Sequence, residues 1–323
     1  MSEKSYDVAA LGELLIDFTQ NGTSEQGNPL FEANPGGAPA NVLAMLKKLG
    51  HSCAFVGKVG ADGFGDLLEN TLRGAGIDAR GLRRDRDVHT TLAVVHTFEN
   101  GDRDFSFYRK PGADVRLSAD ELDEAVLRSC RVFHFGSLSL TDEPARTATR
   151  RAVELARQSG ALISYDPNLR PPLWESEEQA REQIAWGLAQ CDVLKISDNE
   201  VEFMCATTDF DEGAAMLRRR YPNIRLLNIT AGAAGSYAYC GDLRAFEPGC
   251  KLGGVIETTG AGDTFCACAL HDILSRGLDT LSEPRLHELL RFANAAAYLV
   301  TTRRGAIRSM PEPAEIDAVL ARM

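Results

Sequence analysis

From about residue 130 onward, apolar runs rich in β-formers alternate with amphipathic segments of helical period. The strand-like runs are continuously apolar, as in 224–230, and such runs are typical of strands buried on both faces. The alternation predicts an α/β protein with a mostly parallel central sheet covered by helices on both faces. The expected strands cover 131–140, 161–168, 192–197 and 224–230, and the expected helices cover 143–160, 176–191, 212–221, 262–276, 285–300 and 312–322.

The first third of the chain has a different pattern. Two β-rich segments, 90–98 and 102–109, are joined by Glu99-Asn100-Gly101-Asp102, and an Asn-Gly pair is a strong hairpin signal. We expect a small β-sheet lid, formed by segments of about 13–36 and 88–112, on a single domain that spans 1–323. No internal repeat or linker divides the sequence.

Composition and charge narrow the classes of function. The chain has 323 residues, of which 44% are hydrophobic and 25% are charged, which is ordinary for a globular protein with a large core. A formal net charge of -11 disfavours nucleic acid and anionic membrane surfaces as partners. Eight scattered cysteines without a Cys-x-x-Cys pair indicate neither a disulfide framework nor a zinc site. The N-terminal segment shows no secretory signal pattern, so we expect a cytoplasmic protein.

The run Thr258 to Phe265, Thr-Thr-Gly-Ala-Gly-Asp-Thr-Phe, stands directly before an expected helix. Its small residues let backbone N–H groups converge at a helix N-terminus, which favours an anion such as phosphate. A carboxylate in such a cradle can remove the proton of a hydroxyl beside a transferring phosphoryl group. The alternative is that Asp263 only caps the helix.

Two N-terminal segments carry candidate ligands for a polyol. Asp17 ends an apolar strand on the same side as Glu13, and a carboxylate there can accept hydrogen bonds from hydroxyl groups. Gly36 and Gly37 have no Cβ to block a ligand, and Asn41 follows in the first turn of a helix. A solvated acid and a helix-capping asparagine are the structural alternatives.

Further polar groups follow the expected strands, at the edge where open α/β sheets bind ligands. Asp166, Asn168 and Arg170 lie at or just beyond the carboxyl end of the strand 161–168. Glu200 opens a helix after the strand 192–197, where it can hold hydrated magnesium or merely cap the helix. Glycines 232 and 235 follow the strand 224–230, in a turn that can admit nucleotide phosphates. No P-loop and no dinucleotide fingerprint occur.

Together these motifs resemble the PfkB, or ribokinase-like, carbohydrate kinase family over nearly the whole chain. The shared elements are Gly-Gly-x-x-x-Asn early, Thr-x-Gly-x-x-Gly later and Gly-Ala-Gly-Asp last. Within the family, DRDFSFYRKPGAD and SYDPNLRPPLWES are most similar to segments of fructokinases. The resemblance implies a three-layer α/β/α sandwich with a small β-sheet lid.

The resemblance also implies roles for particular residues. Asp263 would be the general base, and the amides of Gly260, Ala261 and Gly262 would form an anion hole. The substrate-binding residues would be Asp17, Gly36, Gly37, Asn41, Arg109 and Arg170, and the residues at the nucleotide and its magnesium would be Lys195, Glu200, Thr230, Gly232, Gly235 and Asn294. The implied cofactors are ATP and Mg²⁺, with K⁺ as a further candidate.

Three positions depart from the family pattern. Ser197 replaces the asparagine of the Asn-x-x-Glu motif that ends at Glu200, and Leu43 replaces a small residue. Glu257 stands where the family has the aspartate that often supports a monovalent cation, and its longer side chain can shift or abolish potassium activation.

The resulting hypothesis is ATP-dependent phosphorylation of a sugar hydroxyl, most closely D-fructose to D-fructose 6-phosphate. The alternatives are a 2-keto-3-deoxygluconate kinase, a ribokinase or nucleoside kinase, and a sugar or nucleotide sensor without catalysis. Family analogy favours a homodimer through the lid.

Overall fold

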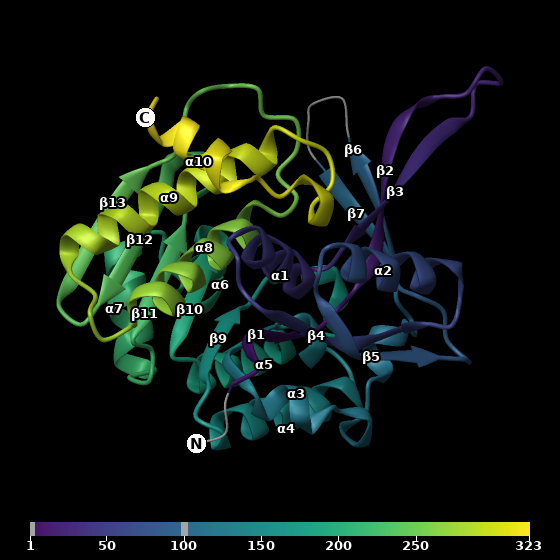
Figure 1. The fold of residues 1–323 in the computed structure, drawn as a ribbon, viewed down its shortest axis with the longest axis horizontal. Helices are drawn as coiled ribbons and strands as arrows, with labels where there is room; N and C mark the ends of the chain where they lie inside the picture. Colours follow the sequence, from purple (N-terminus) through teal and green to yellow (C-terminus); the bar gives the residue numbers. More distant parts are fainter. Residues whose placement is uncertain (1–3, 98–102) are drawn as a thin grey trace.

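The computed structural model describes residues 4–97 and 103–323, and its centre is a nine-stranded sheet (Figure 1). The strands lie in the order β13 (Leu243–Pro248), β12 (Gly235–Cys240), β11 (Leu226–Thr230), β10 (Val193–Ser197), β9 (Leu162–Asp166), β8 (Cys130–Gly136), β1 (Tyr6–Leu11), β4 (Cys53–Gly60) and β5 (Asp78–Asp85). From β11 to β5 all neighbours in this order run parallel, whereas β12 and β13 are added antiparallel at one edge.

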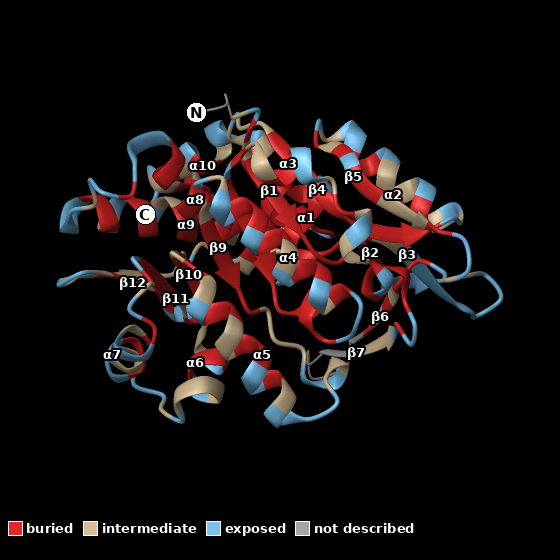
Figure 2. Ribbon diagram, turned by 90° about the horizontal axis from the view of Figure 1, so that it is seen from below, coloured by how far each residue is buried: buried red, intermediate tan, exposed pale blue. Residues whose placement is uncertain are grey.

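Helices cover both faces of this sheet, and the buried strands lie between them (Figure 2). One face packs against α1 (Ala38–Lys48), α2 (Gly63–Gly74), α8 (Ala261–Arg276), α9 (Glu283–Thr301) and α10 (Pro313–Leu320). The other packs against α3 (Glu124–Arg128), α4 (Ala145–Gln158), α5 (Glu177–Gln190), α6 (Asp198–Cys205) and α7 (Phe210–Arg220). The predicted three-layer α/β/α sandwich is therefore confirmed. Among the described residues, no helix combines the length and apolarity that a membrane span needs.

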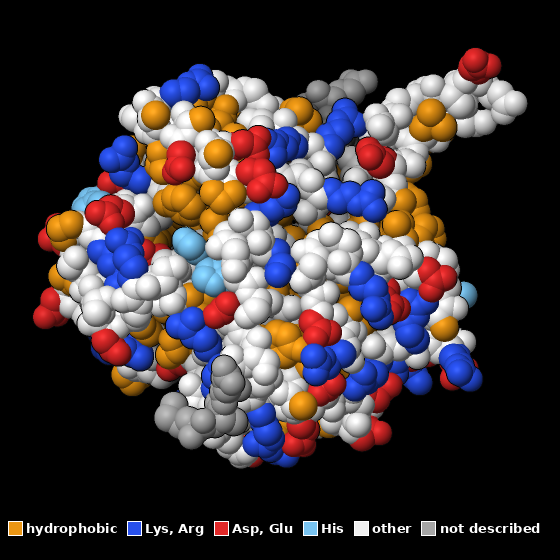
Figure 3. Space-filling model, viewed as in Figure 1, with side chains coloured by type: hydrophobic (Ala, Val, Ile, Leu, Met, Phe, Trp, Pro, Cys, Tyr) orange, Lys and Arg blue, Asp and Glu red, His pale blue; other side chains and the backbone are white. Residues whose placement is uncertain are grey.

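A second, four-stranded sheet lies beside the first. Its order is β3 (Pro29–Gly36), β2 (Leu15–Thr23), β6 (Leu92–Thr97) and β7 (Arg103–Tyr108). The β2–β3 hairpin projects away from the body of the protein, as both the ribbon and the space-filling view show (Figures 1 and 3). The predicted turn 99–102 between β6 and β7 lies outside the described residues.

The ends of several elements differ from the sequence prediction. The strand expected over 131–140 ends at Gly136, and Leu138–Leu140 form a 3₁₀ turn whose side chains are buried in the core. The sequence stays apolar beyond Gly136 because Leu138 and Leu140 are buried, although they no longer pair with a neighbouring strand. The strand expected over 161–168 ends at Asp166, since Pro167 has no N–H to continue the ladder.

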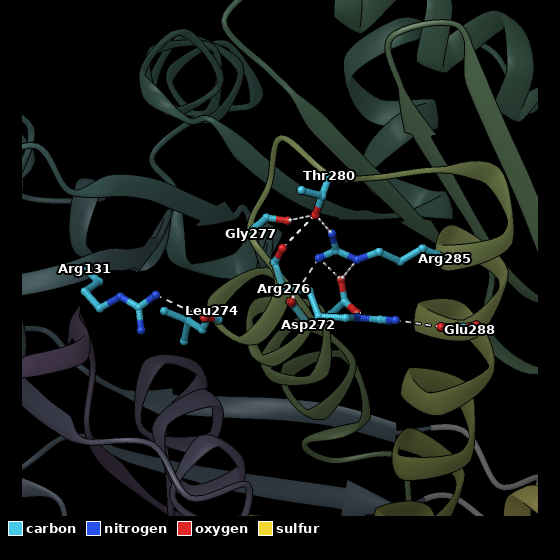
Figure 4. A network of polar contacts seen from close by, with 8 residues as sticks. All are labelled: Arg131, Asp272, Leu274, Arg276, Gly277, Thr280, Arg285 and Glu288. Atoms are coloured by element: carbon cyan, nitrogen blue, oxygen red, sulfur yellow. Dashed lines mark hydrogen bonds and ion pairs between the residues drawn. The ribbon is translucent and has the colours of Figure 1, made fainter.

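Polar contacts fix the C-terminal half of α8 (Figure 4). The N-terminal end of the same helix carries the Gly-Ala-Gly-Asp motif. Arg285 from α9 donates to the Asp272 carboxylate at 2.9 Å and to the Asp272 carbonyl at 3.0 Å. Arg131 from β8 donates to the carbonyl of Leu274 at 3.0 Å. Positive groups at the C-terminal end of a helix complement its dipole, so these contacts stabilise α8.

Candidate active site

The candidate site is a cavity of about 450 Å³ at the carboxyl ends of the central parallel strands. Strand ends of the main sheet, β2, the starts of α1 and α8, and Phe107 of β7 all contribute to its wall. A second cavity of about 260 Å³ shares Thr230, Gly232, Thr258 and Gly262 with the first and continues toward α9. The two cavities therefore form one continuous cleft over the N-terminus of α8.

Asp263 lies in the first turn of α8, where the chain enters the helix through Gly260 in the left-handed conformation (φ 80°). Burial and the nearby charge of Asp166 raise the pKa of the Asp263 carboxyl to about 6, against the lowering effect of Asn41 and Lys195. Asn41 Nδ2 donates to Asp263 Oδ2 at 2.7 Å. The pKa lies below neutral pH, so Asp263 is mostly a carboxylate there and can accept a proton.

Asn41 offers the cavity a free acceptor. Its Nδ2 is held by Asp263, while its Oδ1 is buried and has no hydrogen-bond partner among the described residues. A buried unpaired oxygen costs free energy until a donor satisfies it. Because Asn41 lines the cavity, that donor can be a ligand hydroxyl.

Lys195 places a positive charge against the start of α8. It forms a buried ion pair with Asp166, with Nζ to Oδ2 at 3.0 Å. Burial alone would lower the pKa of Lys195, but the charges of Asp166 and Glu200 outweigh it and raise the pKa above its usual value. A Cβ at Gly262 would lie 2.9 Å from Lys195 Nζ, so the glycine leaves room for the ammonium group.

Acidic groups dominate the opposite end of the first cavity. Burial, together with the charges of Glu257 and Asp263, raises the pKa of Asp17 to about 7, although Arg170 lowers it. A Cβ at Gly36 would lie 2.6 Å from Asp17 Oδ2, so this glycine makes space for the carboxylate.

Gly37 starts α1 with a φ of 124°. A Cβ there would lie 2.3 Å from the carbonyl oxygen of Glu13. Only glycine fits both the backbone conformation and this contact. The Gly36-Gly37 pair therefore brings β3, β2 and α1 together around the cavity.

Arg109 is placed differently from the sequence prediction, which has it contacting the substrate. It is absent from the lining of the site cavity, and its guanidinium is buried, with only 3% of the side chain exposed. It pairs with Asp114 at 2.7 Å and donates to Thr141 Oγ1 at 3.0 Å and to the Leu138 carbonyl at 2.7 Å. Its donors are thus committed to the protein, because the fold brings Asp114, Thr141 and the Leu138 carbonyl together around the guanidinium.

Glu200 lines the cavity and also joins two loops. Its Oε2 accepts from the Ser197 N–H at 2.8 Å and its Oε1 from the Leu169 N–H at 2.7 Å. Ser197 in turn caps α6 by accepting from the Glu200 N–H at 3.4 Å. The serine that departs from the family pattern therefore still forms a reciprocal capping box with Glu200.

The second cavity is lined mainly by small and apolar residues and by backbone. Gly235 has a φ of 123°, and a Cβ there would lie 2.2 Å from the Glu247 carbonyl oxygen. Asn294 is buried, and its amide is used internally: Oδ1 accepts from Ser236 Oγ at 2.8 Å and Nδ2 donates to the carbonyls of Glu247 and Pro248, both at 3.2 Å.

Glu257 is buried beside the C-terminal end of α9. Its Oε1 accepts from the Gly305 N–H at 2.9 Å, and its own N–H donates to the Thr301 carbonyl at 3.1 Å. It does not line the first cavity, but its charge acts on Asp17. Within the described ranges, no group of three or more His, Cys, Asp or Glu side chains is arranged to hold a metal ion by itself.

Of the predicted site residues, the structure places these around the first cavity: Asp17, Gly37, Asn41, Arg170, Lys195, Glu200, Thr230, Gly232, Gly260, Gly262 and Asp263. Gly235, Ala261 and Asn294 line the second cavity. Gly36 and Arg109, both predicted to bind the substrate, line neither cavity; Gly36 lies against Asp17 instead. Glu13, Leu138 and Phe107 line the first cavity although the sequence motifs did not assign them to it. The predicted placement of Glu13 and Asp17 on one side of a single strand that ends at Asp17 is wrong: β1 ends at Leu11, Glu13 lies between the strands, and Asp17 lies inside β2. Leu138 and Phe107 had no signal in the sequence.

The chain matches the model of the pfkB family carbohydrate kinases over residues 5–313. Probable fructokinase-2 of Arabidopsis thaliana is 43% identical over 310 residues, which cover 95% of this chain and 94% of that protein. Fructokinase-1 of Zea mays is 43% identical over 311 residues, covering 96% of each chain. A fructokinase from Xylella fastidiosa with bound ATP superposes with a TM-score of 0.88 at 29% identity, covering 98% of this chain and 99% of that one.

With the fold and the buried acid at the start of α8, these similarities define a phosphotransferase that uses an alcohol group as acceptor. The chain belongs to the pfkB family of carbohydrate kinases. The resemblance drawn from the sequence motifs is confirmed, as is its closeness to fructokinases.

Proposed function

We propose that this protein transfers the γ-phosphoryl group of ATP to D-fructose and forms D-fructose 6-phosphate. Curated relatives about 42% identical over most of the chain are fructokinases. The observation that carries the proposal is Asp263, a buried carboxylate held by Asn41 in the first turn of α8 and facing the cavity.

In the proposed reaction, Asp263 accepts the proton of the sugar hydroxyl while that oxygen forms a bond to the γ-phosphorus. The bond between the γ-phosphorus and the bridging oxygen breaks, and ADP leaves with its electron pair. The N–H groups at Gly260 to Gly262, the dipole of α8 and the Lys195 ammonium stabilise the charge on the transferring group. Asn41 orients the base.

Magnesium fits the donors on this wall. Glu200 and Asp198 line the cavity with carboxylate oxygens, and hard oxygen donors, partly through water, are what Mg²⁺ prefers. One solved neighbour, a putative ribokinase II from E. coli, is in complex with ATP and Mg²⁺. When bound, the ion would neutralise phosphate charge, and Glu200 would hold its water shell from a carboxylate that two backbone N–H groups fix in place.

A monovalent cation near Glu257 belongs to the same proposal. A fructokinase variant from Vibrio cholerae is described with fructose, ADP and potassium ion bound. Glu257 supplies a buried carboxylate, one oxygen of which (Oε1) accepts a hydrogen bond from the Gly305 N–H. We expect higher turnover in potassium than in sodium, and equal turnover in the two salts would remove this part of the proposal.

We further propose a cytoplasmic homodimer joined through the four-stranded sheet, which also acts as a lid over the sugar. Large apolar side chains are exposed on it: Leu30 (48%), Phe31 (43%) and Tyr108 (65%). Light scattering of the purified chain tests the dimer, and a monomer at micromolar concentration would contradict it.

The second candidate within the family is 2-keto-3-deoxygluconate kinase, whose substrate carries a carboxylate. Glu13 and Asp17 line the first cavity, and their negative charge disfavours an anionic sugar. The positive charge of Arg170 can partly offset this repulsion. A substrate panel with coupled ADP release separates the candidates. Fructose as the best substrate is expected; a preference for the acid sugar or a nucleoside would replace the proposal, and no ADP release with any of them would indicate a sensor.

A further inference from the structure

Glu13 is a buried acid in the wall of the sugar-binding cavity that none of the proposed catalytic steps uses. It lies between β1 and β2, with 4% of the residue exposed. Its Oε1 accepts from the N–H of Ala38, the first residue of α1, at 2.9 Å. One carboxylate oxygen is therefore fixed at the helix start, which orients the group toward the cavity it lines.

Arg109 lies behind the same wall. It donates to the carbonyl of Leu138, and Leu138 and Glu13 both line the cavity. Arg109 and Glu13 attract each other electrostatically, while Asp114, the ion-pair partner of Arg109, repels Glu13. Burial raises the pKa of Glu13 to about 7, and the charge of Arg109 opposes this rise.

The surrounding structure leaves Arg109 little freedom. Asp114 also accepts a hydrogen bond from Thr91, which directly precedes β6, and a Cβ at Gly112 would lie 1.9 Å from Thr91 Oγ1. The guanidinium is thus fixed where the four-stranded sheet joins the main body. The charge of this fixed cation acts on Glu13 and favours the ionised form of its buried carboxyl group.

We propose that Glu13 is a further sugar-binding residue and that Arg109 is the positioning residue that maintains its carboxylate in the cavity wall. This inference rests on the proposed function. The ligand group is a neutral sugar hydroxyl, which donates to the Glu13 oxygen in a charge-assisted hydrogen bond. Such bonds are stronger than those between neutral groups, so Glu13 adds selectivity for a polyol.

The first test is Glu13→Gln, which retains an oxygen to accept from Ala38 but removes the charge. We expect the KM for fructose to rise about 10- to 100-fold, as the loss of a hydrogen bond to a charged group predicts, with kcat and the KM for ATP changed less than about threefold. Glu121→Gln is the matched control, since its carboxylate also accepts from a backbone N–H, at Ser118, but lies outside the cavity. An unchanged fructose KM in Glu13→Gln would overturn the inference.

A double-mutant cycle tests the role of Arg109. Arg109→Lys keeps a positive charge but cannot reproduce the guanidinium contacts that fix that charge in place. Alone it should raise the fructose KM several-fold, but it should have little further effect in the Glu13→Gln background, because the carboxylate on which Arg109 acts is gone. Additive effects would show that Arg109 acts only through general stability. If Arg109→Lys does not fold, Thr141→Val takes its place in the cycle, since it removes one acceptor of the guanidinium.

The wild-type control separates the two levels of the proposal. If the wild type phosphorylates no sugar in the panel, the proposed function fails and this inference fails with it. If the wild type is active and Glu13→Gln keeps the wild-type sugar KM, only the role of Glu13 is wrong.

Discussion

The two ends of the candidate active-site cleft are lined by different kinds of residue. At the end proposed to bind the sugar, called the sugar end, ionisable side chains converge: Glu13, Asp17 and Asp263 line the cavity, and each has a carboxyl pKa raised mainly by burial. At the end proposed to bind ATP, called the nucleotide end, Gly235, Ala297 and Phe265 are typical of the lining, and the buried amide of Asn294 is bonded to other parts of the protein.

Under the proposed function, this difference gives the two ends of the cleft different tasks. At the sugar end, binding and proton transfer would depend on single carboxyl groups, whose protonation decides whether they accept or donate. At the nucleotide end, recognition would depend on the space that the backbone leaves, because the buried amide of Asn294 already has partners. Substitutions at the sugar end should therefore change catalysis and sugar affinity, whereas those at the nucleotide end should change stability and ATP affinity.

The largest effect is expected from Asp263→Asn. The amide can still contact Asn41 but cannot accept the hydroxyl proton, so kcat should fall by about two to four orders of magnitude, as for loss of a general base. The fructose KM should stay within about threefold. Steady-state kinetics decide this, and turnover close to that of the wild type would refute the role of Asp263.

Gly235→Ala and Gly232→Ala form a matched pair at the nucleotide end. Gly235 has a φ of 123° and a backbone oxygen 2.2 Å from the new Cβ, so its substitution should lower the free energy of unfolding by about 2–5 kcal/mol. Gly232 has a φ of 52° and open space around it, so about 1 kcal/mol is expected. Chemical denaturation measures both. Equal losses would show that conformation alone, and not the close approach, matters.

The pH dependence of kcat/KM sharpens the view of the sugar end. The proposed general base must be deprotonated, and burial raises the pKa of Asp263 in the protein without ligands to about 6. Because kcat/KM reports the groups of the free enzyme, we expect it to fall about tenfold for each pH unit well below 6. The profile is measured at fructose and ATP concentrations well below their KM values. A flat profile down to pH 5 would exclude a single titrating base.

The smallest effect on catalysis is expected from Asn294→Ala. It leaves Ser236 and the Glu247 carbonyl without their partner, which should cost about 1–3 kcal/mol of stability. The Michaelis constant for ATP should rise only a few-fold, because the amide shapes the wall and is not free to bind the base. The Michaelis constant for fructose serves as the internal control. If ATP binding instead weakens by two orders of magnitude or more, Asn294 recognises the nucleotide directly.

Much of the fold follows from local patterns. The alternation of continuous apolar strands with amphipathic helices predicted β8 to β11 and the helices from α4 onward, including the helix that Glu200 was expected to open, with small shifts at the ends. The antiparallel strands β12 and β13 were not predicted, since short segments such as Gly235–Cys240 gain strand character only by pairing with β11. Pairing across a sheet is a tertiary property that no local period carries.

The sequence by itself determined the family, the α/β architecture and the importance of the Gly-Ala-Gly-Asp segment, because glycine spacing and burial periodicity are local properties of the chain. The tertiary structure decided which side chains have free atoms. It left Asn41 Oδ1 without a partner among the described residues, committed Arg109 to Asp114 and Leu138, and placed Glu13 in the cavity wall. The reason is physical: hydrogen bonds between segments far apart in sequence use up donors and acceptors, and only the folded chain brings those segments together.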